Sequence, residues 1–178
     1  MGATASRGTL MTIAATLSLT LTACASEPED AASPAQAETE PSPEVHRALR
    51  FQAQTTDGEQ FDGETLADAT AVLWFWTPDC GECSGLASVV AATDQAYENI
   101  DFHGVAGRAE LEEIQAFEAQ NGLEDMTTLI DEYGTIWGGF EVISPPSFVF
   151  LRSDGTHTTV SGAMTVSELD ETIAQELE

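Results

Sequence analysis

The feature that most constrains the fold is an apolar run that is followed closely by two cysteines. Residues 71–76 read AVLWFW, without a charged or hydroxyl-bearing side chain. Such a run is typical of a central β-strand that is buried on both faces. Cys80 and Cys83 come after a short turn, and apolar residues from there to Tyr97 recur at helical spacing. Strand, turn and helix in this order predict an α/β fold with the cysteines at the start of a helix.

The remainder of the chain, from about residue 45, continues this alternation of strands and helices. An Asp-Gly pair at 154–155 predicts a hairpin turn between two β-rich runs. Ser167 is the expected N-cap of the last helix. We therefore expect strands at 48–56, 101–107, 127–131 and within 147–162, a short strand and helical turn within 57–68, and helices at 108–123, 132–142 and 165–178.

The segment 108–123 has the clearest helical periodicity. Asn121-Gly122 is its expected stop, because glycine readily adopts the left-handed conformation that ends many helices. Its expected buried stripe consists of Leu111, Ile114, Phe117 and Leu123.

The first 23 residues have the composition of an export signal. Arg7 precedes a mostly apolar stretch from Leu10 to Leu21, which ends in small residues. This stretch is shorter than the ~20 apolar residues that a membrane-spanning helix needs, so cleavage is expected. The sequence LTAC at 21–24 resembles the bacterial lipobox, which implies lipidation of Cys24 and cleavage just before it. The alternative is an ordinary secretory signal with a chance cysteine.

Composition divides the chain into three parts. Residues 1–23 are the predicted lipoprotein signal peptide. Residues 24–44 are rich in Ala, Pro, Ser and Glu and contain no aromatic residue, Leu, Ile or Val, so we expect a disordered acidic tether. Residues 45–178 are long enough for one domain with its own core.

The charge balance excludes one class of partner. The chain has 31 Asp and Glu residues against five Arg, and it has no Lys. Nucleic-acid binding is excluded, because phosphate contacts need a basic patch. The acidic surface is interpreted either as an adaptation to a salt-rich habitat or as a solvated anionic face without a specific partner.

The placement of the two cysteines favours redox chemistry. With Cys24 lipidated, Cys80 and Cys83 remain as a matched pair, in a compartment where disulfides persist. Free N–H groups and the dipole at a helix N-terminus favour a thiolate at Cys80, the attacking species. Cys83, one turn further on, is expected to be more buried and to resolve a mixed disulfide. A structural staple is the alternative, although so short a loop constrains little of the unfolded chain.

Two metal-binding alternatives also stand. Zinc would find only two cysteine ligands here, and no histidine spacing points at the pair. A copper carrier would use the pair with His103 or His157. We expect no metal and no cofactor.

The segment FWTPDCGEC resembles the active-site segment of thioredoxin-fold disulfide oxidoreductases. From about Phe51 to Leu177 the order of segments is similar to that of the TlpA/DsbE branch. The closest likeness is to the secreted or membrane-anchored DsbE-type proteins of actinobacteria. That group has similar segments at the places of GVAGRAELEEIQAFEAQNGL, LIDEYGTIWGGFEV and PPSFVFLRSDGT. The resemblance implies a thioredoxin-like fold, with a central mixed sheet flanked by helices and an N-terminal β extension.

The same resemblance implies roles for four residues. Cys80 corresponds to the nucleophile and Cys83 to the resolving cysteine. Trp76 is the aromatic residue beneath the site. Pro146 is the proline that faces the pair, after a cis peptide bond.

Three positions depart from the family pattern. Asp79 stands where members usually have Trp, so charge replaces part of the hydrophobic rim for partner docking. Trp74 stands where thioredoxin has a buried Asp, and Leu86 where some reductive members have Glu. No proton donor or acceptor is therefore assigned to the pair.

The favoured function is a lipid-anchored thiol–disulfide oxidoreductase on the outer face of the cell membrane. It would exchange disulfides with exported cysteine-containing proteins and with a membrane redox partner, and the oxidase direction is preferred. The alternatives are a reductant in cytochrome c maturation, a non-enzymatic copper carrier and a thioredoxin-like binding module with a merely structural disulfide.

Overall fold

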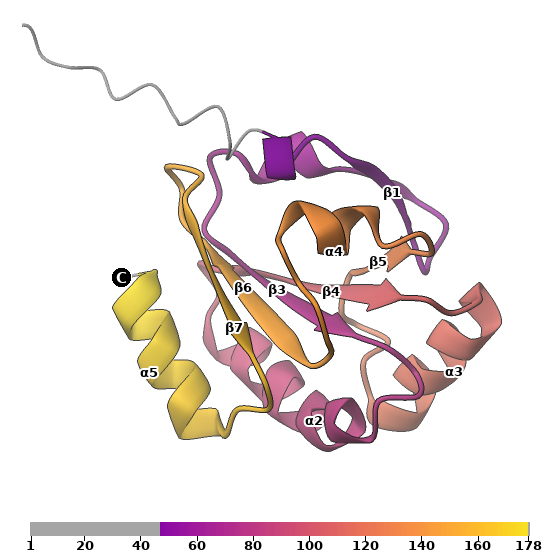
Figure 1. Cartoon of the computed structure of the whole chain (residues 1–178). Coiled ribbons are helices and arrows are strands. Elements are labelled where there is room, and N and C mark those ends of the chain that lie inside the picture. The colour runs from indigo at the N-terminus through magenta and orange to yellow at the C-terminus, as the bar shows by residue number, and fades with distance from the viewer. Residues whose placement is uncertain (1–46, 178) are drawn as a thin grey trace, which may run out of the picture. The chain divides into compact units, whose positions relative to one another are not determined.

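A seven-stranded mixed sheet forms the centre of the domain in the computed structural model, which describes residues 47–177 (Figure 1). The strand order is β2-β1-β5-β4-β3-β6-β7. In chain order the elements are β1 (Gln52–Thr55), β2 (Gln60–Asp62), the 3-10 helix η1 (Gly63–Leu66), β3 (Ala71–Trp76), α2 (Gly81–Ala96), β4 (Asp101–Gly107), α3 (Leu111–Asn121), β5 (Thr128–Asp131), α4 (Thr135–Gly139), β6 (Ser147–Leu151), β7 (His157–Ser161) and α5 (Val166–Glu176).

The strands combine two pairing modes. Strands β3, β4 and β5 are parallel, and β6 and β7 extend the sheet beyond β3 as an antiparallel hairpin. On the other side, β1 pairs antiparallel with β5, and β2 pairs antiparallel with β1. This β1–β2 pair is the N-terminal extension that the resemblance implies, and the fold is thioredoxin-like as expected.

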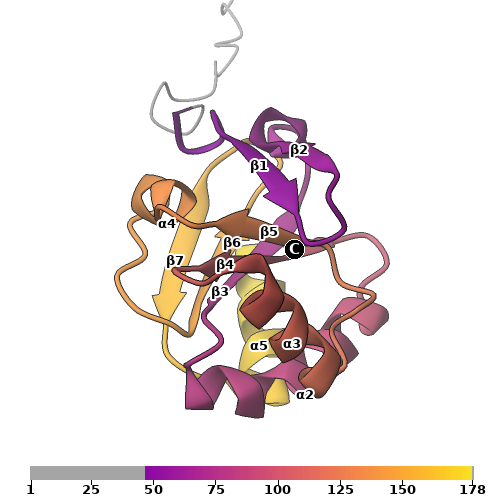
Figure 2. The same cartoon turned by 90° about the vertical axis from the view of Figure 1, so that its right-hand side faces the viewer.

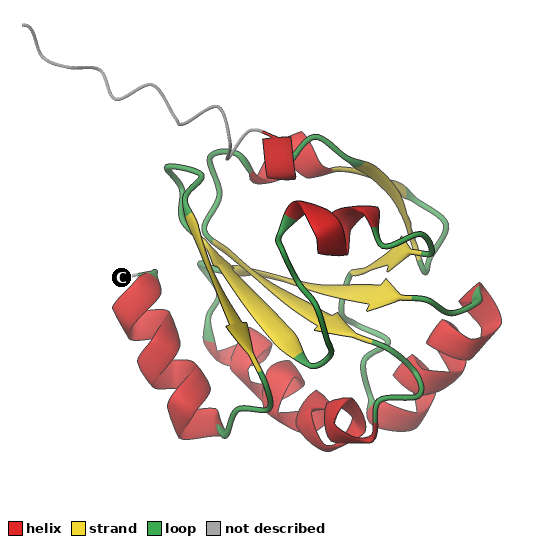
Figure 3. Ribbon diagram, in the orientation of Figure 1, coloured by secondary structure: helices red, strands yellow, loops and turns green. Residues whose placement is uncertain are grey.

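Strand β3 separates two apolar clusters, and all six of its side chains are buried. Val72, Trp74 and Trp76 pack with α2, α3 and α5, whereas Leu73 and Phe75 pack with α4 and the segment around Leu49. The sheet therefore lies between three helices on one face and α4 with η1 on the other (Figures 2 and 3). The prediction of a central strand buried on both faces is confirmed.

Two sequence expectations about helices are wrong. Leu111 was expected in the buried stripe of α3, but its side chain is 43% exposed, since the helix begins at this residue and its first turn lies beyond the core. The N-cap of α5 is Thr165 rather than Ser167: the Thr165 hydroxyl accepts from the N–H of Glu168, whose carboxylate accepts from the N–H of Thr165.

The predicted stop of α3 is confirmed. Gly122 has φ +69°, and its N–H donates to the carbonyl of Glu118. No helix within residues 47–177 is long and apolar enough to cross a membrane. The predicted signal peptide, Cys24 and the tether lie outside the described residues.

Candidate active site

Cys80 occupies the turn between the end of β3 and the start of α2. It is the N-cap of α2, and its N–H donates to the carbonyl of Thr77 over 3.1 Å. Its Sγ accepts a hydrogen bond from the N–H of Cys83, also over 3.1 Å. The sulfur therefore lies at the positive end of a 16-residue helix, where a thiolate is stabilised after reduction.

The two cysteines differ in their access to solvent. Their sulfurs form a disulfide, with 1.99 Å between the two Sγ atoms. Cys83 has no exposed surface and belongs to the apolar cluster under α2, whereas Cys80 is half-buried. An attacking thiolate from another molecule can therefore reach the Cys80 sulfur and not that of Cys83.

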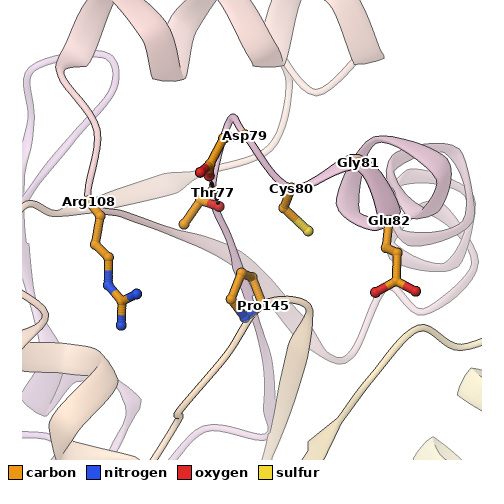
Figure 4. A pocket seen from close by; sticks show the side chains of 7 residues that line it. All are labelled: Thr77, Asp79, Cys80, Gly81, Glu82, Arg108 and Pro145. Carbon is orange, nitrogen blue, oxygen red and sulfur yellow. Dashed lines mark hydrogen bonds between the residues drawn. The ribbon is translucent and has the colours of Figure 1, made fainter.

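Cys80 opens into a surface cleft of about 380 Å³ (Figure 4). Within it, the hydroxyl of Thr77 donates a 2.5 Å hydrogen bond to Oδ1 of Asp79. Two exposed carboxylates and one exposed guanidinium thus line the same cleft as Cys80. The cleft is lined by Thr77, Asp79, Gly81, Glu82, Arg108 and Pro145 around Cys80.

The resemblance also gives a role to Trp76 and Pro146. Trp76, the last residue of β3, is fully buried and stacks on Phe117 of α3, with 4.3 Å between ring centroids. The Pro145–Pro146 peptide bond is cis, as the resemblance implies. Pro145 lines the cleft, and the carbonyl of Pro146 accepts from the N–H of Gly162 at the end of β7.

Hydrophobic side chains occupy the two positions at which the resemblance implies an acid in other members of the fold. Trp74 is fully buried in the cluster that contains Cys83, and Leu86 of α2 is buried there too. A buried acid does exist in α3: Glu118 is 4% exposed and accepts a hydrogen bond from the hydroxyl of Thr56. Its burial raises the pKa of the Glu118 carboxyl.

The metal-carrier alternatives find no support in this arrangement. His103 lies on β4 with its ring against Phe61, and His157 lies on β7 with its ring against Phe140. In the sheet register His103 stands opposite Leu73, which packs in the cluster that does not contain Cys83. Burial lowers the pKa of both histidines. Within the described part of the chain, no group of three or more His, Cys, Asp or Glu residues could hold a metal ion.

Comparison with known proteins identifies the family, although no protein-family model matches the chain. The soluble secreted antigen MPT53 of Mycobacterium tuberculosis is 39% identical over 123 residues, which cover 69% of this chain and 70% of the antigen. A solved structure of a secreted M. tuberculosis disulfide oxidoreductase homologous to Escherichia coli DsbE is 39% identical, with a TM-score of 0.67. The match covers 72% of this chain and 97% of the chain in that structure.

The structure of M. tuberculosis DsbF in mixed oxidised and reduced forms is 35% identical, with a TM-score of 0.70. The match covers 72% of this chain and 96% of the DsbF chain. The chain belongs to the DsbE-like thiol–disulfide oxidoreductases of the thioredoxin fold. More distant structures, such as StoA of Bacillus subtilis at 21% identity and a TM-score of 0.59, share the fold. For a DsbE-like enzyme, the disulfide at the head of α2 is the group expected to react.

Two residues of the cleft were missed by the sequence interpretation. Arg108 follows β4 directly, and β4 lies parallel to β3, so the carboxyl ends of both strands meet at the edge where Cys80 lies. That adjacency was a usable signal, because strands joined by a helix usually pair in parallel. Pro145 was passed over for its neighbour Pro146, and no sequence pattern distinguishes which of two adjacent prolines lines a cleft.

Proposed function

We propose that this oxidoreductase is exported, is held at the outer face of the cell membrane by lipid on Cys24, and oxidises cysteine pairs in other exported proteins. The observation that carries the proposal is the unequal exposure of the two sulfurs at the head of α2, with Cys80 open to the cleft and Cys83 fully buried. Export is supported by the signal-like residues 1–23 and by the relatives that are named secreted.

The proposed reaction transfers two electrons from the client to the enzyme. A client thiolate attacks Sγ of Cys80, the Cys80–Cys83 bond breaks, and Cys83 leaves as a thiolate that takes up a proton. The second client thiol, after losing its proton, attacks the client sulfur of the mixed disulfide, and Cys80 leaves as a thiolate. The client gains one disulfide, and the enzyme pair is reduced to two thiols.

The oxidase direction is supported by the surroundings of Cys80. The N–H of Cys83 and the start of α2 stabilise a Cys80 thiolate, and stabilising the reduced form makes a disulfide more oxidising. Asp79 and Glu82 oppose this effect, since a nearby negative charge disfavours a second one. The membrane redox partner that reoxidises the pair is part of the proposal.

The deciding experiment uses oxidised enzyme and reduced ribonuclease A. We expect the recovery of ribonuclease activity to be faster with the wild type than with a Cys80→Ser variant. We also expect an equilibrium with glutathione to give a reduction potential above the ~−270 mV of thioredoxin. A potential near that value, without faster refolding, would contradict the oxidase and favour the reductant of cytochrome c maturation.

A further inference from the structure

Arg108 has a backbone conformation that non-glycine residues rarely adopt. It follows the last residue of β4, and its φ is +57°. For a residue with a Cβ, this left-handed conformation is sterically unfavourable and persists where the surrounding structure imposes it. The turn therefore directs the Arg108 side chain, which is exposed and lines the cleft at Cys80.

The ring of Trp137 provides a platform for the guanidinium. The Arg108 Cζ atom lies 5.3 Å from the Trp137 ring centroid, within the range of a cation–π interaction. Trp137 itself is 2% exposed, and its backbone N–H donates to Oδ2 of the buried Asp131 over 2.9 Å. Because Phe75 also contacts this ring edge-on, at 5.7 Å between centroids, the platform is fixed by the core.

Arg108 makes no ion pair with any residue of 47–177, although Asp79 and Glu82 line the same cleft. The two ion pairs among residues 47–177 join Arg50 to Glu64 and Arg152 to Glu176. The guanidinium of Arg108 thus keeps its hydrogen-bond donors available at the rim of the cleft. In Figure 4, Pro145 lies between Arg108 and Cys80, and Asp79 and Glu82 lie nearer to the cysteine.

We propose that Arg108 is a specificity-determining residue, which binds a carboxylate on the client polypeptide near the cysteine that reacts with Cys80. A client that reaches Cys80 through this cleft and continues across Pro145 brings its neighbouring side chains to Arg108. The planar guanidinium can pair with a carboxylate through two parallel hydrogen bonds. A basic side chain at that place would meet Arg108 as a like charge. This inference rests on the proposed function, because it assumes a polypeptide client.

The test uses the oxidised full chain and a set of reduced dithiol peptides. The peptides differ only in one residue near the first cysteine. That residue is Glu, Gln or Lys, and each peptide of the set carries it at a different position before or after the cysteine. Rates of peptide oxidation are measured by acid quenching and chromatography. At one or more positions the wild type should oxidise the Glu peptide roughly two- to fivefold faster than the Gln peptide, as expected of an exposed ion pair. High salt should reduce that preference.

Variants of Arg108 separate recognition from a general effect on the thiol. Arg108→Gln should remove the preference for Glu, Arg108→Glu should reverse it towards Lys, and Arg108→Lys should restore part of it. Arg47→Gln, which removes another exposed arginine that makes no ion pair with the described residues, should leave the preference unchanged. Thermal denaturation checks that each variant is folded.

Equal rates for the Glu and Gln peptides at every position would overturn the inference and leave the proposed function standing. A loss of rate in Arg108→Gln by the same factor for all peptides would overturn it as well, since the residue would then act on the thiol. If the wild type oxidised none of the peptides and did not refold ribonuclease, the proposed function itself would fail.

Discussion

The hydroxyl of Thr77 holds the carboxylate of Asp79 through a 2.5 Å hydrogen bond, in the cleft that contains Cys80. The negative charge next to the reactive sulfur is therefore fixed in place. A fixed charge acts on a neighbouring thiolate more strongly than one that samples many rotamers. The first prediction concerns this charge.

Asp79→Asn should raise the rate at which reduced Cys80 reacts with iodoacetamide at neutral pH, by roughly two- to fivefold. The amide keeps an acceptor for the Thr77 hydroxyl and removes the charge that opposes the thiolate. The reduction potential should rise in parallel, as measured against glutathione. Glu98→Gln, an exposed change of similar chemistry beyond the far end of α2, is the matched control. An unchanged alkylation rate would show that the Asp79 charge is screened.

The second prediction separates the two sulfurs. Cys83→Ser should accumulate mixed disulfides with client proteins, because the buried thiol that would release them is gone. Cys80→Ser should form none, since the remaining sulfur has no exposed surface. Non-reducing gels of cells that produce each variant give the measurement. Comparable complexes with both variants would contradict the assigned order of attack.

The third prediction concerns Glu118 and pH. Burial raises the pKa of this carboxyl, and the nearby hydroxyls of Thr128 and Thr56 oppose that effect in part. Because the folded-state pKa lies above the unfolded one, the ionised form disfavours folding. The loss of folding free energy that ionised Glu118 causes is absent below the unfolded-state pKa, and it grows as the pH rises towards the folded-state pKa.

Glu118→Gln should remove this pH dependence and keep an acceptor for the Thr56 hydroxyl. The free energy of unfolding of the wild type, relative to the variant, should therefore fall as the pH rises through that window. Urea denaturation over a pH series gives the comparison, with Glu98→Gln as the surface control. Parallel curves for the wild type and Glu118→Gln would be inconsistent with a raised pKa.

The fourth prediction tests the packing under Arg108. A Cβ at Gly107 would lie 2.8 Å from atoms of the Trp137 ring, so Gly107→Ala should destabilise the domain by about 1–3 kcal/mol. A Cβ at Gly85 in α2 would meet nothing within 4 Å, and Gly85→Ala should stabilise by about 0.5–1 kcal/mol. Chemical denaturation measures both changes. Equal effects would mean that the Trp137 ring moves away at little cost.

The fifth prediction concerns the anchor. A fatty-acid probe added to growing cells should label the wild type and fail to label Cys24→Ala. The reason is that the lipobox-like LTAC offers its cysteine as the acceptor. Gel fluorography gives the measurement, and Cys83→Ser serves as a control that should stay labelled. Persistent labelling of Cys24→Ala would place the lipid elsewhere.

The sequence predicted those parts of the fold that depend on local chemistry. Strand β3 was evident because a strand buried on both faces must be apolar throughout, and the end of α3 because Gly122 suits a left-handed residue. The cysteines were placed at a helix start for the same kind of local reason. The N-cap of α5 at Thr165 was also predictable, since Thr-x-x-Glu is the pattern of a capping box.

Features that depend on distant contacts were beyond local patterns. The exposure of Leu111 depends on where α3 extends past the sheet, and periodicity carries no information on that. Likewise, the burial of Glu118 depends on its contact with Thr56, 62 residues earlier in the chain. Arg108 reaches the cleft because β4 pairs with β3, and its guanidinium lies over the ring of Trp137, which comes 29 residues later in the chain.

The position of Trp76 gives this enzyme an intrinsic optical reporter. Its indole lies in the same apolar cluster as Cys83, as does that of Trp74, and a disulfide near an excited indole quenches its emission. Reduction of the pair should therefore brighten the tryptophan fluorescence without any attached dye. Electron transfer between the enzyme and a partner can then be followed in real time by stopped flow, with Trp76→Phe identifying the indole that carries the signal.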